Sequence, residues 1–236
     1  MIPLRDANPT RRSAIVTLAI VIGCCMAFAW ELGLGAGSGD AALNRLITDW
    51  GVVPARLMAT WGRGDFLSVD TATLITSQFL HGGWLHLLGN MLYLWIFGNN
   101  VEDRFGRLGF LLFYLAGGAV AGLAQVAVDP TSGAPTIGAS GAIAATLGAY
   151  IVLFPRARVT SLIFLGFFYQ LLNIPAVVVL GFWFLLQLVD GFASLGVTQS
   201  GCVAFFAHIG GFVLGAMIGF AVRHSPVGPA GRRGVG

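Results

Sequence analysis

The chain has 236 residues, of which 56% are hydrophobic and only 10% are charged, and its formal net charge is +3. A soluble domain typically has about 25% charged residues, so this composition excludes disordered proteins, nucleic-acid scaffolds and ordinary cytosolic enzymes. We therefore predict a polytopic membrane protein that is surrounded by the lipid bilayer and has no nucleic-acid partner.

The first twelve residues are polar, and the apolar segment that follows them, Ser13–Trp30, is too long for the apolar region of a signal peptide. We expect residues 1–12 to form a cytoplasmic tail. Ser13–Trp30 is predicted to be a first transmembrane helix that is retained in the protein.

Five further segments could cross a bilayer, whose apolar core is about 30 Å thick and needs about 20 helical residues. The predicted fold is an all-α, six-helix membrane domain over residues 13–222, followed by a cytoplasmic tail over residues 223–236. The five further spans are Trp84–Val101, Leu108–Val128, Ala139–Phe154, one helix within Val159–Val189, and Val203–Val222. Pro175 should begin the fifth helix, since proline suits a first helical turn. The apolar piece before it, Ser161–Leu172, is expected at the interface or under the bundle.

The arginines support this number of spans, because basic residues concentrate on the cytoplasmic side of a membrane protein. Placing both termini inside puts most arginines on that side and leaves three in one outer loop. The inner arginines are Arg5, Arg11, Arg12, Arg104, Arg107, Arg156, Arg158, Arg223, Arg232 and Arg233, and the outer ones are Arg45, Arg56 and Arg63. The outer loop, Glu31–Gly83, is predicted to be the only sizeable non-helical region and to dip into the interface, because it contains Trp50 and Trp61.

Polar side chains within the spans are the candidates for function, since lipid excludes them unless they have a role. His86 and Asn90 lie four residues apart and share a helix face, with His81 about a turn before them. Ser140 stands in the first turn of a short helix, within Gly138-Ala139-Ser140-Gly141. Each feature alone has a simpler explanation, namely interhelical hydrogen bonding for the first pair and helix capping with packing glycines for the serine.

The last span carries His208, Gly211 and Gly215 on one face. A single histidine in a membrane helix is more often a packing or proton-relay group than a base. However, the second, fourth and sixth spans run in the same direction, so Ser140, His86, Asn90 and His208 share one depth below the outer face.

This combination fits acyl transfer. Ser140 could be the nucleophile and His208 its base. The helix start at Ser140, together with Asn90 and His86, could stabilise an oxyanion. Acidic residues fall near span ends, so we expect a Ser–His dyad without a buried carboxylate. No cofactor and no metal site are predicted, because the histidines lack zinc-binding spacing.

Three segments resemble the rhomboid family of intramembrane serine proteases: HGGWLHLLGNMLYLWIFGNNVED from His81, GASGAIAATLGAY from Gly138, and HIGGFVLGA from His208. The resemblance extends over Thr73–Val222. It implies that Ser140 is the nucleophile and His208 the general base. It also implies an oxyanion hole and a set of supporting residues. The oxyanion donors would be His86, Asn90 and the amides of Ala139 and Ser140, and the supporting residues would be His81, Gly138, Gly141, Gly211 and Gly215.

Two positions depart from the pattern of some family members. A Trp-Arg pair in the first loop is replaced by Trp61-Gly-Arg63, which leaves the anchoring of that loop open. An aromatic residue four positions after the serine is replaced by Ala144, which leaves open what holds the His208 ring.

The resulting hypothesis is a protease of a bacterial inner membrane that cuts transmembrane segments of other proteins, with its site open to the outer face. One alternative is a catalytically silent rhomboid-like protein that binds membrane helices. Another is a transporter, although such proteins often have repeated halves and binding sites near the midplane, and neither is seen here.

Overall fold

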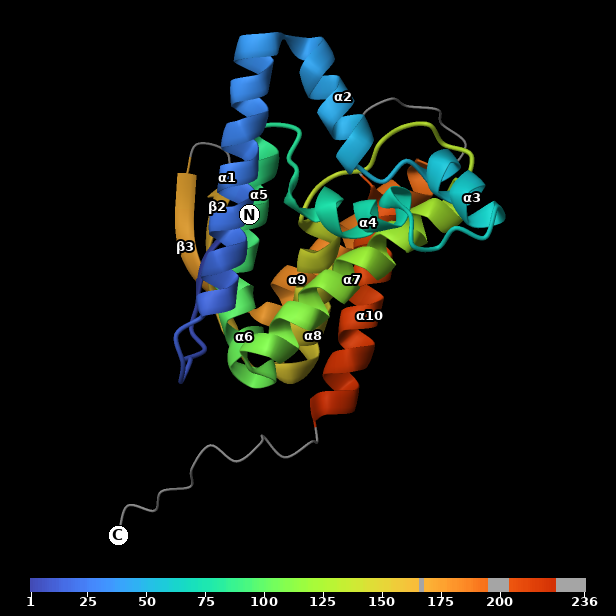
Figure 1. The fold of residues 1–236 in the computed structure, drawn as a ribbon. Coiled ribbons are helices and arrows are strands. Elements are labelled where there is room, and N and C mark those ends of the chain that lie inside the picture. Colours follow the sequence, from blue (N-terminus) through green and yellow to red (C-terminus); the bar gives the residue numbers. More distant parts are fainter. Residues whose placement is uncertain (166–167, 195–203, 224–236) are drawn as a thin grey trace.

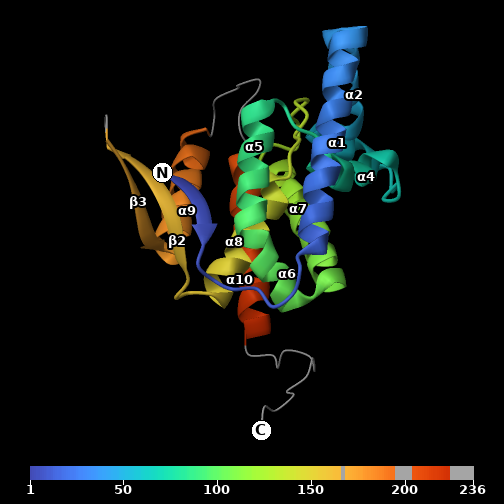
Figure 2. The ribbon, with the colours of Figure 1, turned by 90° about the vertical axis from the view of Figure 1, so that its left-hand side faces the viewer.

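The computed structural model describes residues 1–165, 168–194 and 204–223. They form a mainly helical bundle with a small sheet on one flank (Figures 1 and 2). The longer helices are α1 (Ile15–Ser38), α2 (Asp40–Trp50), α3 (Pro54–Gly62), α4 (Val69–Thr76), α5 (Trp84–Tyr93), α6 (Asn99–Phe105), α7 (Arg107–Val128), α8 (Ser140–Leu153), α9 (Ala176–Ala193) and α10 (Phe205–Arg223). A 3₁₀ turn, η1 (Ser77–Phe79), precedes α5, and a π-helical turn, η2 (Leu94–Gly98), joins α5 to α6.

Four of these helices, α1, α7, α9 and α10, are long and apolar enough to cross a membrane, as judged by length and composition among the described residues. The other two predicted spans coincide with the continuous run α5–η2–α6 and with α8, which has only 14 residues. The number of six spans therefore stays a prediction. The predicted cytoplasmic tail beyond residue 223 and the start of the last span at Val203 lie outside the described residues.

The prediction of an all-α fold is wrong in one respect, because the chain also contains a three-stranded antiparallel sheet in the order β1-β2-β3. Its strands are β1 (Ile2–Asp6), β2 (Arg158–Leu165) and β3 (Phe168–Pro175). Ile2 pairs with Leu162, and Arg158 pairs with Pro175. The segment expected at the interface is therefore part of the β2–β3 hairpin. Part of the expected N-terminal tail is β1, which pairs with β2 as the third strand of the sheet. The expected helix start at Pro175 is confirmed, since Pro175 is the N-cap of α9.

The first outer loop is also more ordered than predicted, because the expected non-helical segment 31–83 holds the end of α1, all of α2–α4 and η1. Its tip has its own anchors. The Trp61 indole N–H donates to Thr71 Oγ1 at 2.8 Å, and Arg56 Nε lies 2.6 Å from Asp70 Oδ1. Thr60 also donates to Asp70, at 2.6 Å. These three contacts anchor the tip of the loop in the absence of a Trp-Arg pair.

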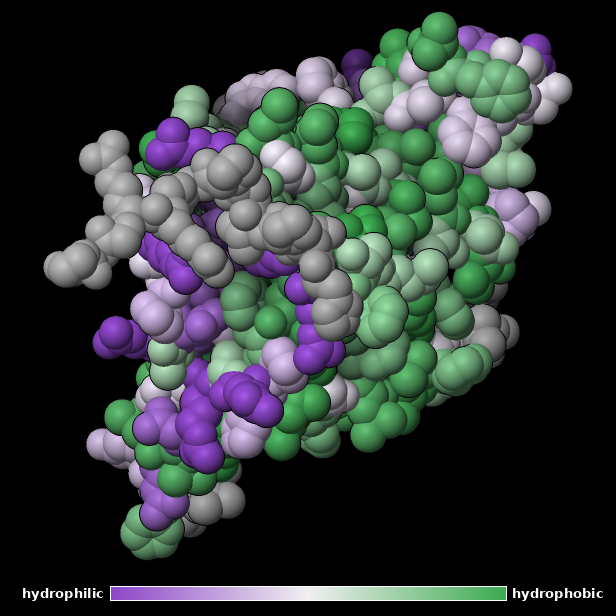
Figure 3. All heavy atoms as spheres, turned by 90° about the horizontal axis from the view of Figure 1, so that it is seen from below, coloured by the Kyte–Doolittle hydropathy of each residue, from purple (hydrophilic) through white to green (hydrophobic). Residues whose placement is uncertain are grey.

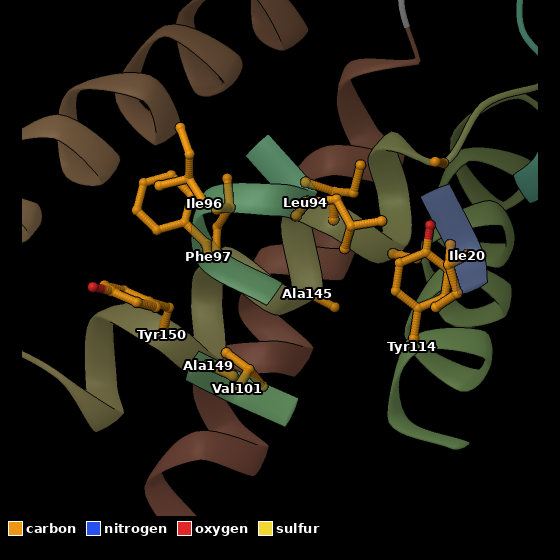
Figure 4. Close-up of a cluster of buried hydrophobic side chains, with 14 of the residues drawn as sticks. Ile20, Leu94, Ile96, Phe97, Val101, Tyr114, Ala145, Ala149 and Tyr150 are labelled. Carbon is orange, nitrogen blue, oxygen red and sulfur yellow. The ribbon is translucent and has the colours of Figure 1, made fainter. Parts of the chain in front are cut away.

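The core is centred where η2 meets α8, and its side chains are shown in Figure 4. The rings of Phe97 and Tyr150 meet edge to face, with centroids 4.9 Å apart. The Tyr150 hydroxyl then donates to Asp6 Oδ2 at 2.8 Å, and Asn100 Nδ2 donates to the same oxygen at 2.6 Å. One buried carboxylate of β1 therefore ties the sheet to α6 and α8.

The surface of the bundle is largely apolar, as expected for a protein in lipid. Large side chains such as Met26, Leu85, Trp95 and Phe220 are exposed on four different elements. Seen from below, hydrophilic residues are gathered over part of the lower face and hydrophobic residues cover much of the rest (Figure 3). Arg223, the last residue of α10, lines a depression together with Arg156 and Arg158.

Candidate functional site

Ser140 begins α8 at the wall of a cavity of about 740 Å³, which is lined by residues from α5, α7, α8, α9 and α10. The chain enters α8 through Gly138, whose φ of +126° is rarely adopted by residues with a side chain. The Gly138 N–H donates to Ser77 O at 2.9 Å. A Cβ atom at Gly138 would lie 2.7 Å from His86 Nε2. The predicted supporting role of Gly138 thus has a physical basis, since only glycine fits both the backbone and the space.

Ser140 and His208 are brought together, with His208 Nε2 2.7 Å from Ser140 Oγ. Glycines permit this approach of α8 and α10. A Cβ atom at Gly211 would collide with the Gly141 carbonyl oxygen, and one at Gly215 would collide with the Ala145 carbonyl oxygen. The glycine face predicted on the last helix therefore packs directly on the backbone of α8.

His86 and Asn90 line the same cavity from α5. The Gly82 N–H donates to His86 Nδ1 at 3.3 Å, so the proton of a neutral His86 ring resides on Nε2, the nitrogen near Gly138. Asn90 Nδ2 is buried and has no hydrogen-bond partner among the described residues. The first amides of α8, including that of Ser140, have no acceptor within the helix. All these donors belong to groups that border the cavity at Ser140.

His81 does not reach the cavity but supports its wall. Its ring packs edge to face on His86, with centroids 5.1 Å apart, and its Nδ1 lies 3.2 Å from Phe79 O. Its backbone N–H donates to both carboxylate oxygens of Glu31, at 3.1 and 3.3 Å. Glu31 is only 2% exposed, so the expectation that no carboxylate is buried is wrong. The helix α1 continues eight residues beyond Trp30, which places Glu31 inside the bundle, beside the start of α5 rather than beside His208.

Two residues of α9 contact His208, and sequence reasoning missed one of these contacts and left the other open. Gln187 Oε1 lies 2.6 Å from His208 Nδ1. The Trp183 ring lies against the His208 ring, with centroids 5.8 Å apart and planes tilted by 37°. Trp183 therefore provides the aromatic contact that Ala144 cannot make. An amide within an apolar span was the available signal for Gln187, since such groups usually bond to another helix.

The chain is similar to known proteins over the region that holds this site. A family model described as the Rhomboid domain matches residues 69–225. The chain is 34% identical over 160 residues to the protein named Rhomboid protease GluP of Bacillus subtilis, which covers 68% of this chain and 28% of that protein. It is 30% identical over 165 residues to the mitochondrial Rhomboid protein 1 of Saccharomyces cerevisiae, covering 64% of this chain and 41% of that protein.

A third relative, the chloroplastic Rhomboid-like protein 11 of Arabidopsis thaliana, is 42% identical over 69 residues, which cover 29% of this chain and 24% of that protein. The chain thus spans less than half the length of each of these relatives. The family match covers more than half of the chain and includes α5, α8 and α10, the helices that border Ser140. This chain is an integral membrane protein that belongs to the rhomboid family.

Proposed function

We propose that the protein is an intramembrane serine protease that hydrolyses peptide bonds in or near transmembrane segments of other membrane proteins. The observation that carries the proposal is the 2.7 Å approach of Ser140 Oγ and His208 Nε2 inside a cavity that also holds His86 and Asn90. A serine hydroxyl is a weak nucleophile without a base, and this pair supplies both.

In the proposed mechanism, Ser140 Oγ attacks the scissile carbonyl carbon while His208 Nε2 takes the hydroxyl proton. The carbonyl oxygen becomes an oxyanion, which the Ser140 amide, His86 Nε2–H and Asn90 Nδ2 stabilise by hydrogen bonds. His208 then returns its proton to the leaving nitrogen as the C–N bond breaks and an acyl ester forms on Ser140. A water molecule, deprotonated by His208, attacks the ester, which releases the new carboxyl group and restores Ser140.

The unpaired donor of Asn90 supports this assignment. A buried amide N–H without a partner costs free energy of the order of 1–3 kcal/mol. Such a cost is accounted for if the donor pairs with an oxyanion during the reaction. The Ala139 amide is the fourth proposed donor and would assist that of Ser140, because Ala139 is the N-cap of α8 and Ser140 its first residue.

The proposed substrates enter from the lipid, past α9, and reach a cavity that water fills from the outer face of a bacterial inner membrane. Arg223 ends α10, and that end of α10 lies far from α2 (Figure 1). Arg156 and Arg158 line the same depression as Arg223, which supports a cytoplasmic location of that end. A cysteine at position 140, in a background lacking Cys24, Cys25 and Cys202, should react with an impermeant thiol reagent from outside only. Labelling from the cytoplasmic side alone would reverse the proposed orientation.

The central test is cleavage of a panel of single-span membrane proteins by the purified protein in detergent and in vesicles. Ser140→Ala and His208→Ala should each lower turnover by about 10³-fold or more, and the double variant should be no worse than either, since the two act as one unit. A fluorophosphonate should label Ser140 of the wild type only. Turnover by Ser140→Ala would rule out the proposal, and binding of substrates without cleavage by the wild type would favour a catalytically silent helix-binding protein.

A further inference from the structure

Both ring nitrogens of His208 have partners. Nε2 lies 2.7 Å from Ser140 Oγ, and Nδ1 lies 2.6 Å from Gln187 Oε1. Gln187 is a half-buried residue of α9, whereas His208 belongs to α10 and Ser140 to α8. The partner of one imidazole nitrogen decides which nitrogen carries the proton and in which plane the ring stands.

We propose that Gln187 is a positioning residue for the Ser140–His208 pair. An amide oxygen can only accept a hydrogen bond, so His208 Nδ1 must carry the ring proton. The lone pair is then on Nε2, facing Ser140 Oγ, which is the form that a general base requires. The inference rests on the proposed function and adds a third, neutral group to a pair that the sequence predicts to act alone.

The contacts that orient the His208 ring come from α9. Among the described residues, no carboxylate is hydrogen-bonded to the His208 ring. Across the cavity the titratable groups are His86 and Tyr93, and on α9 itself Asp190 is exposed. Trp183, one turn before Gln187 on the same helix, packs on the ring. Both contacts of α9 therefore act on the orientation of the His208 ring.

A consequence is that the proposed active form depends on the docked position of α9. Trp183 and Gln187 lie four residues apart and face α10 together. Moving α9 away from α10 would remove the Nδ1 hydrogen bond and the ring contact at once. A substrate that entered beside α9 would therefore be cut only after α9 had returned to His208.

The kinetic test uses Gln187→Met, which keeps the length of the side chain but removes the acceptor. We expect kcat to fall about 10- to 100-fold with KM changed by less than about twofold, because part of the general-base contribution is lost and substrate contacts are kept. The matched control is Gln170→Met on the exposed strand β3, which should leave kcat unchanged. Thermal unfolding of each variant checks that the fold is retained.

Gln187→Glu separates positioning from simple packing. It retains an acceptor, so turnover should approach that of the wild type at alkaline pH. Its carboxylate would stabilise the imidazolium, so the acid limb of the pH profile of kcat should move upward by about one pH unit or more. Wild-type kcat in Gln187→Met together with an unchanged pH profile in Gln187→Glu would overturn the proposal.

A measurement that needs no turnover keeps this inference distinct from the proposed function. The chain has four histidines, so the ring nitrogens of His208 can be observed by NMR in protein labelled with ¹⁵N-histidine. We expect the tautomer with the proton on Nδ1 in the wild type and a mixture in Gln187→Met. A proton on Nε2 in the wild type, or the same tautomer in both proteins, would contradict the role of Gln187. Absence of cleavage by the wild type would contradict only the protease assignment.

Discussion

Near His208, α10 contacts its two neighbours α8 and α9 in different ways. Against α8 the contact is made by backbone, since any side chain at Gly211 or Gly215 would collide with a carbonyl oxygen of α8. Against α9 it is made by side chains, through Trp183 and Gln187 on His208 and through Phe184, which stacks on Phe212 with centroids 4.3 Å apart. Backbone contacts fix a distance, whereas side chains can change rotamer. The spacing of Ser140 and His208 is thus rigid, and the orientation of the His208 ring is adjustable.

Outside the Ser140–His208 pair itself, the largest effect is expected for the donors on α5, which face the pair without belonging to it. Asn90→Ala and His86→Ala should each lower kcat about 10²–10³-fold, because one oxyanion donor is lost. KM should change much less, since the lost hydrogen bond forms mainly in the transition state. Steady-state kinetics with one model substrate measures both parameters. An unchanged kcat in both variants would mean that these residues only pack.

The second prediction compares the two helix contacts directly by the same substitution. Gly215→Ala must push α8 away from α10, which should cost about 1–3 kcal/mol of stability by overpacking and lower kcat about 10²-fold by misplacing His208. Gly181→Ala on α9 meets nothing within 4 Å. It should leave kcat unchanged and stabilise the helix by about 0.5–1 kcal/mol. Thermal unfolding and turnover of the two variants check this difference, and equal losses in both would contradict it.

The third prediction concerns the adjustable contact. Trp183→Ala removes the ring that lies on His208, and an aromatic pair is typically worth about 0.5–1.5 kcal/mol. We therefore expect kcat to fall about three- to tenfold while the free energy of unfolding decreases modestly. Phe182→Ala, at an exposed position of the same helix, is the control. A rise in kcat for Trp183→Ala alone would instead indicate that movement of α9 limits turnover.

The sequence predicted which polar side chains border the cavity better than it predicted the fold around them. Ser140, His86, Asn90 and His208 were identifiable because each is a polar residue near the start of an apolar helix, where local spacing and helical rise set its position. Gln187 and Glu31 were missed because their roles depend on which helices meet, and α1 extends further than its apolar run suggested. Such contacts are tertiary and leave no local pattern.

The sheet was missed for a different reason. A continuous apolar run cannot be assigned to helix or strand by periodicity, and Val159–Leu172 has no alternation that would indicate a strand. Its partner β1 lies more than 150 residues earlier in the chain, within a segment that is polar on average. Only the pairing across that separation makes both segments strands.

The sheet links α8 and α9, the two helices that α10 contacts near His208. Asp6 of β1 accepts a hydrogen bond from Tyr150 of α8, and β3 leads directly into α9. Burial raises the pKa of the Asp6 carboxyl above its usual value, although the hydrogen bond from Tyr150 acts in the opposite direction. The folded protein therefore binds a proton at Asp6 more tightly than the unfolded chain does. The contribution of Asp6 to stability should increase as the pH falls through the raised pKa and decrease as the pH rises through it.

The smallest predicted effect follows from this linkage and is a change in how the unfolding temperature depends on pH. Asp6→Asn keeps the shape of the side chain, but its amide cannot titrate. The loss of stability that Asp6 causes in the wild type, as the pH rises from its ordinary pKa through its raised pKa, should therefore be missing in the variant. The measurement is thermal unfolding of both proteins in detergent between about pH 4 and 7. Every other titratable group is common to the two proteins, so the difference between the two curves isolates Asp6. Parallel curves would show that Asp6 titrates alike in the folded and unfolded chains, and that its hydrogen bonds from Tyr150 and Asn100 offset its burial completely.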